Sequence, residues 1–337
     1  MTLGSDFSDI PGEERVEQIV PIAAGAPARP VTTSSDEGPD PHHEPIDLSG
    51  RPRSQWYLFR RRFLRHRLAI ASIIVLVLLI AMCFGAGLLQ RYTPFVQPAG
   101  RQNLELGAVG PSGDHWFGTD QLGRDYFSEM LYAGRTSLLI GLVVALLSTI
   151  IGTAIGAIAG YFGGISDQFL MRLTDLFLVL PSLIVLALAL RYFGGQVFVI
   201  ELVLAALFWM GLARIVRSQV RSIKEKEFIE AARAGGASSW RIIGRHVLPN
   251  CIGPIVVAAT LAVVQAILVE SALSYLGYGV KPPATSWGSM LSDSKGYFGT
   301  DQAYLIWFPG LAILLTVLCV NFIGDGLRDA FDPKSRL

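Results

Sequence analysis

Charged residues are scarce in this sequence. Asp, Glu, Lys and Arg make up only 16% of the 337 residues, apolar residues make up 51%, and the mean hydropathy is +0.46. This balance differs from that of soluble globular chains. The net charge is only +1, which gives no indication of nucleic acid, so we expect no nucleic-acid partner.

Cysteine and histidine are few and do not cluster. Cys83, Cys251 and Cys319 lie in or beside apolar blocks at spacings that fit no metal motif, so we interpret them as small buried hydrophobic residues. The five histidines are scattered among the tail and the loops. No glycine-rich loop ends in Gly-Lys-Ser or Gly-Lys-Thr, so the phosphate-binding motif of ATPases is missing. We therefore predict no catalytic residue, no metal site and no cofactor in this chain.

Residues 1–67 contain two segments of different character. Residues 1–50 are rich in Pro, Asp, Glu, Gly and Ser without periodicity, so we expect a disordered tail rather than a signal peptide. In residues 51–67, aromatic residues and leucines alternate with arginines. This mixture predicts an amphipathic helix in the membrane interface, although a basic flank that sets topology is an alternative. Both interpretations place this end of the chain in the cytoplasm.

The apolar residues of the remaining chain, 68–337, come in blocks of about 20, the length that a helix needs to cross a bilayer. Only helices or closed barrels satisfy the backbone there, and uninterrupted apolar blocks indicate helices. The sequence therefore predicts an all-α integral membrane protein with about six transmembrane helices. Basic residues between the fourth and fifth blocks and at the C-terminus place both termini in the cytoplasm. The predicted spans are residues 68–89, 137–162, 169–193, 197–216, 253–276 and 303–324.

Three features stand out within these spans. Gly152, Gly156 and Gly160 recur every four residues and predict a stripe where another helix approaches closely. Pro181 predicts a kink in the third span, because proline removes one hydrogen bond from the helix. Arg172 and Asp175 are three residues apart, and we expect them to form an ion pair.

The segment between the fourth and fifth spans, residues 217–250, predicts a short helix, a glycine break, a second short helix and a proline before span five. Gly235 and Gly236 permit a sharp turn or a positive φ. We expect the second helix to be held against the membrane domain by four side chains: Trp240, Ile242, Ile243 and Val247.

The order Glu-Ala-Ala, three residues, Gly, and later Leu-Pro resembles the coupling loop of ABC-importer permease subunits. The His-aliphatic-Leu-Pro-Asn ending, beginning at His246, indicates the peptide and nickel branch of that family. Five further segments resemble the C-type subunit of dipeptide and oligopeptide importers: 115–125, 160–164, 270–277, 309–310 and 321–333. The residues that the resemblance assigns to ATPase coupling are Glu230, Ala231, Ala232, Gly235, Gly236, His246, Leu248 and Pro249.

The resemblance implies a fold like that of type I ABC importers and a subunit of the bacterial cytoplasmic membrane. It implies a homologous second permease subunit, two cytoplasmic ATPases that bind ATP and Mg²⁺, and an extracytoplasmic substrate-binding protein. The expected cargo is a dipeptide or a short oligopeptide. Nickel complexes and glutathione are alternatives, because similar permeases carry them.

Residues of the external loops and of span five are further candidates. We expect residues 126–132 to form a separate interfacial helix with Asp125 as N-cap. Glu270, with Gln265 before it, could meet the amino terminus of a peptide or pair within a subunit interface. The two external loops could receive the binding protein or simply cap the helices, and the residues concerned are Asp120, Asp125, Pro282, Pro283 and Trp287.

Two other classes of protein fit less well. A stand-alone secondary transporter or channel tends to show internal repeats and broken helices with ion ligands at the midplane, and no repeat is visible here. A membrane enzyme would need convergent His, Cys, Asp or Ser groups at one depth. His246 is the only histidine in a suggestive place, and a hydrogen bond that positions the loop explains it better.

Overall fold

The computed structural model describes residues 55–92 and 107–331, which all belong to one compact unit, Arg53–Leu337. The predicted disordered tail, residues 1–50, and the Asp332–Pro333 end of the last motif lie outside the described residues. The described part is helical, apart from an isolated β-bridge between Thr119 and Asp125.

Five helices of the described part are long and apolar enough to cross a membrane, and a bent helix pair raises the number to six. This agrees with the predicted all-α membrane fold of about six spans. The long helices are α2 (Arg67–Phe84), α5 (Tyr126–Phe162), α8 (Val197–Lys224), α11 (Leu248–Tyr275) and α13 (Tyr304–Phe331). The bent pair is α6 (Gly164–Val179) and α7 (Ser182–Phe193).

The third predicted span is broken where the sequence predicts a kink. The axes of α6 and α7 differ by 82°, and Leu180 and Pro181 between them have extended backbone conformations. Proline lacks the N–H that would continue the helix, and it disfavours the α conformation of the residue before it. The kink at Pro181 is therefore confirmed, as a complete break rather than a bend.

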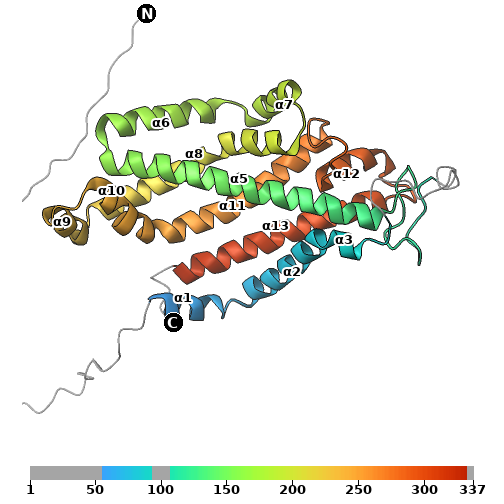
Figure 1. Cartoon of the computed structure of the whole chain (residues 1–337), viewed down its shortest axis with the longest axis horizontal. Helices are drawn as coiled ribbons and strands as arrows, with labels where there is room; N and C mark the ends of the chain where they lie inside the picture. Colours follow the sequence, from blue (N-terminus) through green and yellow to red (C-terminus); the bar gives the residue numbers. More distant parts are fainter. Residues whose placement is uncertain (1–54, 93–106, 332–337) are drawn as a thin grey trace, which may run out of the picture. The chain divides into compact units, whose positions relative to one another are not determined.

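Helix α5 runs through the middle of the bundle and packs along α8 (Figure 1). The predicted glycine stripe forms this contact, because a Cβ added at any of its three glycines would overlap the α8 backbone. The α8 carbonyl oxygens that face Gly152, Gly156 and Gly160 are those of Trp209, Ala213 and Arg217. The stripe therefore allows close packing within this chain, as expected.

The separate interfacial helix expected at residues 126–132 is not present. These residues form the first two turns of α5, which continues without a break to Phe162. Gly134 lies within this continuous helix. A glycine is needed there because a side chain would overlap Trp287 and Cys83. Asp125 is confirmed as the N-cap, since its carboxylate accepts hydrogen bonds from the Ser128 backbone N–H and hydroxyl at 2.9 and 2.7 Å.

The amphipathic segment contains α1 (Gln55–Phe63), and α2 follows from Arg67. The Phe59 ring packs on Phe331 at the end of α13, with 4.5 Å between ring centroids. His66 caps α2 by accepting a hydrogen bond from the Ala69 backbone N–H. A helix is therefore present where the sequence predicts one, and its position in a membrane interface stays a prediction.

The expected ion pair within α6 is wrong. Asp175 pairs with Arg214 of α8 at 2.5 Å instead of with Arg172 of its own helix. About two turns closer to the start of α6, Asp167 accepts two hydrogen bonds from the Arg217 guanidinium at 2.5 and 2.6 Å. Arginines of a neighbouring helix thus reach both carboxylates, and the sequence spacing within α6 does not reveal this.

Candidate functional site

The segment between α8 and α11 lies at one end of the bundle, next to the end of α5 (Figure 1). It contains α9 (Glu227–Ala234) and α10 (Ser239–Ile242), followed by a π-helical turn, η1 (Ile243–Val247). We call this end of the bundle the α9 end, and the opposite end, which holds α3 (Ala86–Leu89) and α12 (Trp287–Ser294), the α12 end.

One side of α9 is anchored in the bundle. Ile229 is fully buried in an apolar cluster with Val220 of α8 and with Ile242 and Val247 of the following turns. Ala232 packs partly against the same cluster. This burial fixes the orientation of α9 although the helix has only eight residues.

The other side of α9 is exposed. Glu230 and Ala231 lie there, together with Phe228, whose side chain is 43% exposed. Aromatic residues are enriched at protein–protein interfaces, so the exposed Phe228 makes this side of α9 a candidate surface for another protein. The sequence analysis overlooked Phe228; its position three residues before Ala231, hence on the same helical face, is the signal that could have identified it.

The glycine break is a helix cap of the Schellman type. Gly236 has φ +80°, and the Gly236 and Ala237 N–H groups donate to the Arg233 and Ala232 carbonyls at 3.0 and 3.1 Å. Gly235 has an ordinary φ of −74°, so only the second of the two predicted glycines needs a positive φ.

Replacing Gly236 by valine is expected to loosen α9, because a β-branched residue at positive φ costs at least about 1–2 kcal/mol. Amide hydrogen exchange of α9 should accelerate about 5- to 30-fold. Gly235→Ala is the matched control, since its φ is ordinary and its nearest neighbour would lie 3.4 Å from the new Cβ. Equal protection of α9 in both variants would contradict the role of Gly236.

The proline before span five does not end a helix. From Ser239 to Tyr275 the chain passes through α10, η1 and α11 as one span-forming helix. In the wide π-turn, the Leu248 N–H donates to the Ile243 carbonyl, five residues back. The turn places Pro249 in the first turn of α11, where the missing N–H is tolerated. The expected helix boundary before span five is therefore wrong, and Pro249 lies within a continuous helix.

Trp240 contributes less to packing than expected, and His246 forms a hydrogen bond through its backbone. Trp240 is 64% exposed and touches the Phe162 ring edge-on at 5.6 Å, so it does not enter the cluster as Ile242, Ile243 and Val247 do. His246 is partly buried, and its carbonyl accepts a hydrogen bond from the Asn250 side chain at 2.6 Å.

Three of the five residues proposed for binding-protein contact are buried. Trp287 is only 1% exposed, and its ring N–H donates to the Met130 carbonyl. Asp125 is occupied as the cap of α5, and Asp120 accepts hydrogen bonds from the Leu122 and Arg124 backbone N–H groups. The side chains of these three residues shape the loops from inside, so a contribution to binding-protein contact would be indirect, through the shape of the loops. Pro282 and Pro283 are exposed, and their docking role stays a prediction.

The α12 end also holds a cluster of charges around Arg124. Its guanidinium lies 2.6 Å from Asp120 and 3.3 Å from Glu129. Burial raises the pKa of the nearby Asp293 carboxyl, and Asp120 adds to this effect while Arg124 opposes it. Next to this cluster, the Gln121 side chain donates a hydrogen bond to the Asp293 carbonyl, which connects the loop before α5 to α12.

Glu270 and Gln265 do not come together. Gln265 is exposed on α11, whereas Glu270 is fully buried. One Glu270 carboxylate oxygen accepts hydrogen bonds from the Ser274 and Ser286 hydroxyls, both at 2.7 Å. Because Ser286 also caps α12, Glu270 connects α11 to the loop that covers it.

The described residues form a bundle of membrane-spanning helices with the short helix α9 at one end. The chain also carries the motifs at 115–125 and 321–329. Together these features indicate a membrane permease subunit of a transporter. The chain belongs to the family of binding-protein-dependent transport system inner membrane components, whose sequence profile matches residues 152–337. Residues 54–106 match the N-terminal TM domain of oligopeptide transport permease C. The predicted resemblance is thereby confirmed, and the chain is a multi-pass inner-membrane component.

Relatives cover nearly the whole described chain. The oligopeptide transport system permease protein OppC of Haemophilus influenzae is 42% identical over 87% of this chain and 92% of its own length. The dipeptide transport system permease protein DppC of Bacillus subtilis is 40% identical over 82% of this chain and 85% of its own length. Among solved structures, a chain of the inward-facing MetNI methionine ABC transporter is 19% identical, covering 60% of this chain and 96% of that chain, with a TM-score of 0.48.

Proposed function

We propose that this chain is a non-catalytic permease subunit of an ATP-driven importer that carries dipeptides or short oligopeptides. The names of its relatives, oligopeptide and dipeptide permease proteins, support the peptide cargo. The exposed side of α9, formed by Phe228, Glu230 and Ala231, is the observation on which the coupling role rests. ATP and Mg²⁺ would bind to partner ATPases, since this sequence lacks a phosphate-binding loop.

A second permease subunit would cover the α6–α7 side of the bundle. The Asp175 and Arg214 side chains are 51% and 50% exposed there. Each lies about 15 Å along its helix from the end at the α9 side. Charged groups inside a membrane avoid lipid and face protein or a water-filled cavity. The half-exposed pair therefore favours a protein partner, with the translocation pathway between the two subunits.

The orientation follows from charge. The α9 end, with α1 and its arginines, would face the cytoplasm, so both termini lie inside and α9 meets the ATPases. The α12 end would face the extracytoplasmic binding protein, with Pro282 and Pro283 available for contact.

Co-purification tests this proposal. The chain, expressed with its neighbouring subunits and extracted in mild detergent, should retain a second permease and Walker-type ATPases. Binding protein loaded with peptide should raise the ATPase rate. A chain that purifies alone and moves solute in liposomes without ATP would instead be a secondary transporter.

Glu270 allows a separate test of a role in substrate binding. Glu270→Gln keeps an oxygen that accepts from both serines, so we expect nearly unchanged thermal stability and peptide uptake. Glu270→Ala leaves two buried hydroxyl hydrogens without their acceptor and creates a cavity, and should cost about 2–4 kcal/mol of folding stability. Loss of uptake in Glu270→Gln at unchanged stability would show that the carboxylate itself serves transport.

A further inference from the structure

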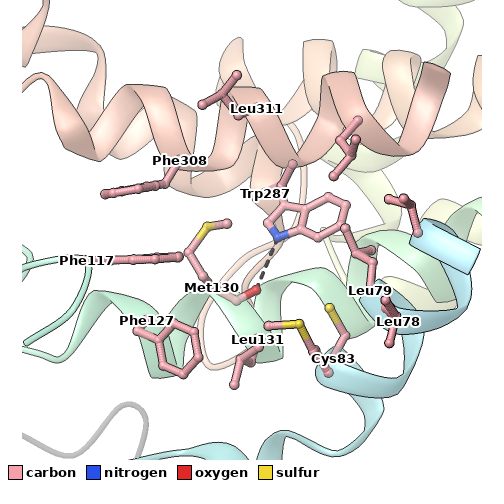
Figure 2. A pocket seen from close by; sticks show the side chains of 14 residues that line it. Leu78, Leu79, Cys83, Phe117, Phe127, Met130, Leu131, Trp287, Phe308 and Leu311 are labelled. Carbon is pink, nitrogen blue, oxygen red and sulfur yellow. Dashed lines mark hydrogen bonds between the residues drawn. The ribbon is translucent and has the colours of Figure 1, made fainter. Parts of the chain in front are cut away.

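An apolar groove of about 390 Å³ lies between α2, α5 and α13 near the α12 end. Figure 2 shows the side chains of these helices converging on it, with Trp287 of α12 behind them. The volume falls in the range of roughly 300–1,000 Å³ that is common for small-molecule sites. It therefore has room for a ligand, and its chemistry restricts which one.

The wall offers no obvious polar partner. The only side-chain N–H group in the lining, that of Trp287, already donates to the Met130 carbonyl at 3.1 Å (Figure 2). The Phe117 ring stacks on Phe308 with 4.0 Å between centroids and closes one end. A polar ligand would lose its hydration in this groove without gaining hydrogen bonds, whereas a hydrocarbon chain loses nothing.

The mouth of the groove lies on the surface that faces the membrane. Four lining side chains on α2 and α13 are 42–58% exposed although they are large and apolar: Leu78, Met82, Leu311 and Leu315. On α2 the lining runs from Val75 to Cys83, about 12 Å along the helix. This length is close to the depth of about 15 Å of one leaflet's hydrocarbon region.

A cation lies toward the α12 end of the groove. The Arg91 guanidinium lies 5.0 Å from the Trp116 ring, which in turn packs 5.1 Å from Phe127 of the lining. An apolar groove of leaflet length with positive charge at its outer end matches the polarity of an anionic phospholipid.

We propose that this groove binds one acyl chain of an anionic phospholipid from the leaflet at the α12 end. The headgroup phosphate is attracted by Arg91, and the chain lies between α2 and α13 against Trp287. The lipid fills space that would otherwise separate α2 from the first turns of α5. The site depends only on the membrane position of these helices and is independent of the cargo.

Fluorescence quenching by brominated lipids tests the proposal in the assembled transporter. A variant that keeps only Trp287, with the other five tryptophans changed to phenylalanine, is placed in nanodiscs with phosphatidylglycerol brominated on the acyl chain. Trp287 should be strongly quenched although its own chain buries it. Ala312→Phe, which fills the groove, should lower the quenching several-fold. A variant that keeps only Trp209, a buried residue of α8 whose ring packs against Phe177 of α6, is the matched control and should show little quenching.

Quenching of Trp287 no stronger than that of Trp209 would overturn the lipid site and indicate that a partner subunit covers the groove. Equal quenching by brominated phosphatidylcholine and phosphatidylglycerol would overturn the headgroup assignment, as would an unchanged preference for phosphatidylglycerol in Arg91→Gln. Native mass spectrometry of the unmodified complex avoids the tryptophan changes. It should detect a retained phospholipid that Ala312→Phe lacks, and its absence from both proteins would contradict the proposal.

Discussion

Glu230→Lys is expected to reduce peptide transport and ATPase co-purification about tenfold or more, while the subunit still inserts and folds. Glu230 lies on the exposed side of α9, so its replacement disturbs no internal contact. A reversed charge at the centre of an interface typically costs 2 kcal/mol or more, which corresponds to roughly 30-fold in affinity. Phe228→Ala should weaken the same interaction, because it removes the one large apolar side chain on this surface of α9.

The measurement is the amount of ATPase retained on the tagged permease, together with uptake of labelled peptide. Asp301→Lys makes the same charge change at an exposed residue of the α12 end and should retain the ATPases fully. Wild-type retention and uptake by Glu230→Lys and Phe228→Ala would remove α9 as the coupling helix. Equal losses in Asp301→Lys would indicate a general effect of the added charge instead.

Gly156→Leu should abolish stable folding. The new Cβ would overlap the Ala213 carbonyl and lie 2.8 Å from the Val216 Cβ, and both belong to α8, so no flexible side chain can move aside. The helices would have to separate along their longest contact, at a cost of about 3 kcal/mol or more. Thermal unfolding in detergent and the monodisperse yield would measure the loss.

Gly211 provides the control for this prediction. It is a helical glycine of α8, but a Cβ added there meets nothing within 4 Å. Gly211→Ala should therefore keep or slightly raise stability, by up to about 1 kcal/mol, since alanine favours helices more than glycine does. Equal destabilisation of the two variants would contradict the interpretation of the α5–α8 contact.

The membrane spans could be predicted because they depend on local sequence. Long apolar blocks need no partner to identify them, and Pro181 breaks a helix through its own covalent structure. The turn at Gly236 is local in the same sense, because a positive φ suits glycine in any fold. The proposed coupling segment could be located from motif order, which is also a property of the linear chain.

The remaining features depend on contacts between distant residues. Asp175 forms its ion pair with Arg214 rather than with Arg172 because α8 packs beside α6, and no local pattern indicates that pairing. Trp287 resembles a surface residue of a polar loop, but the loop folds inward between α5 and α11 and buries it. Pro249 resembles a helix boundary, but the π-turn before it lets the helix continue.

Because α10, η1 and α11 form one continuous helix, a tilt at one end is transmitted to the other end. The rod from Ser239 to Tyr275 has 37 residues and is therefore about 55 Å long. Its first turns are buried in the same cluster as Ile229 of α9, and near its far end Glu270 is hydrogen-bonded to the cap of α12. A tilt of about 5° about the α9 end would displace the far end by roughly 5 Å, about one helical turn. A small displacement of α9 would thus become a larger movement of the loop that leads into α12.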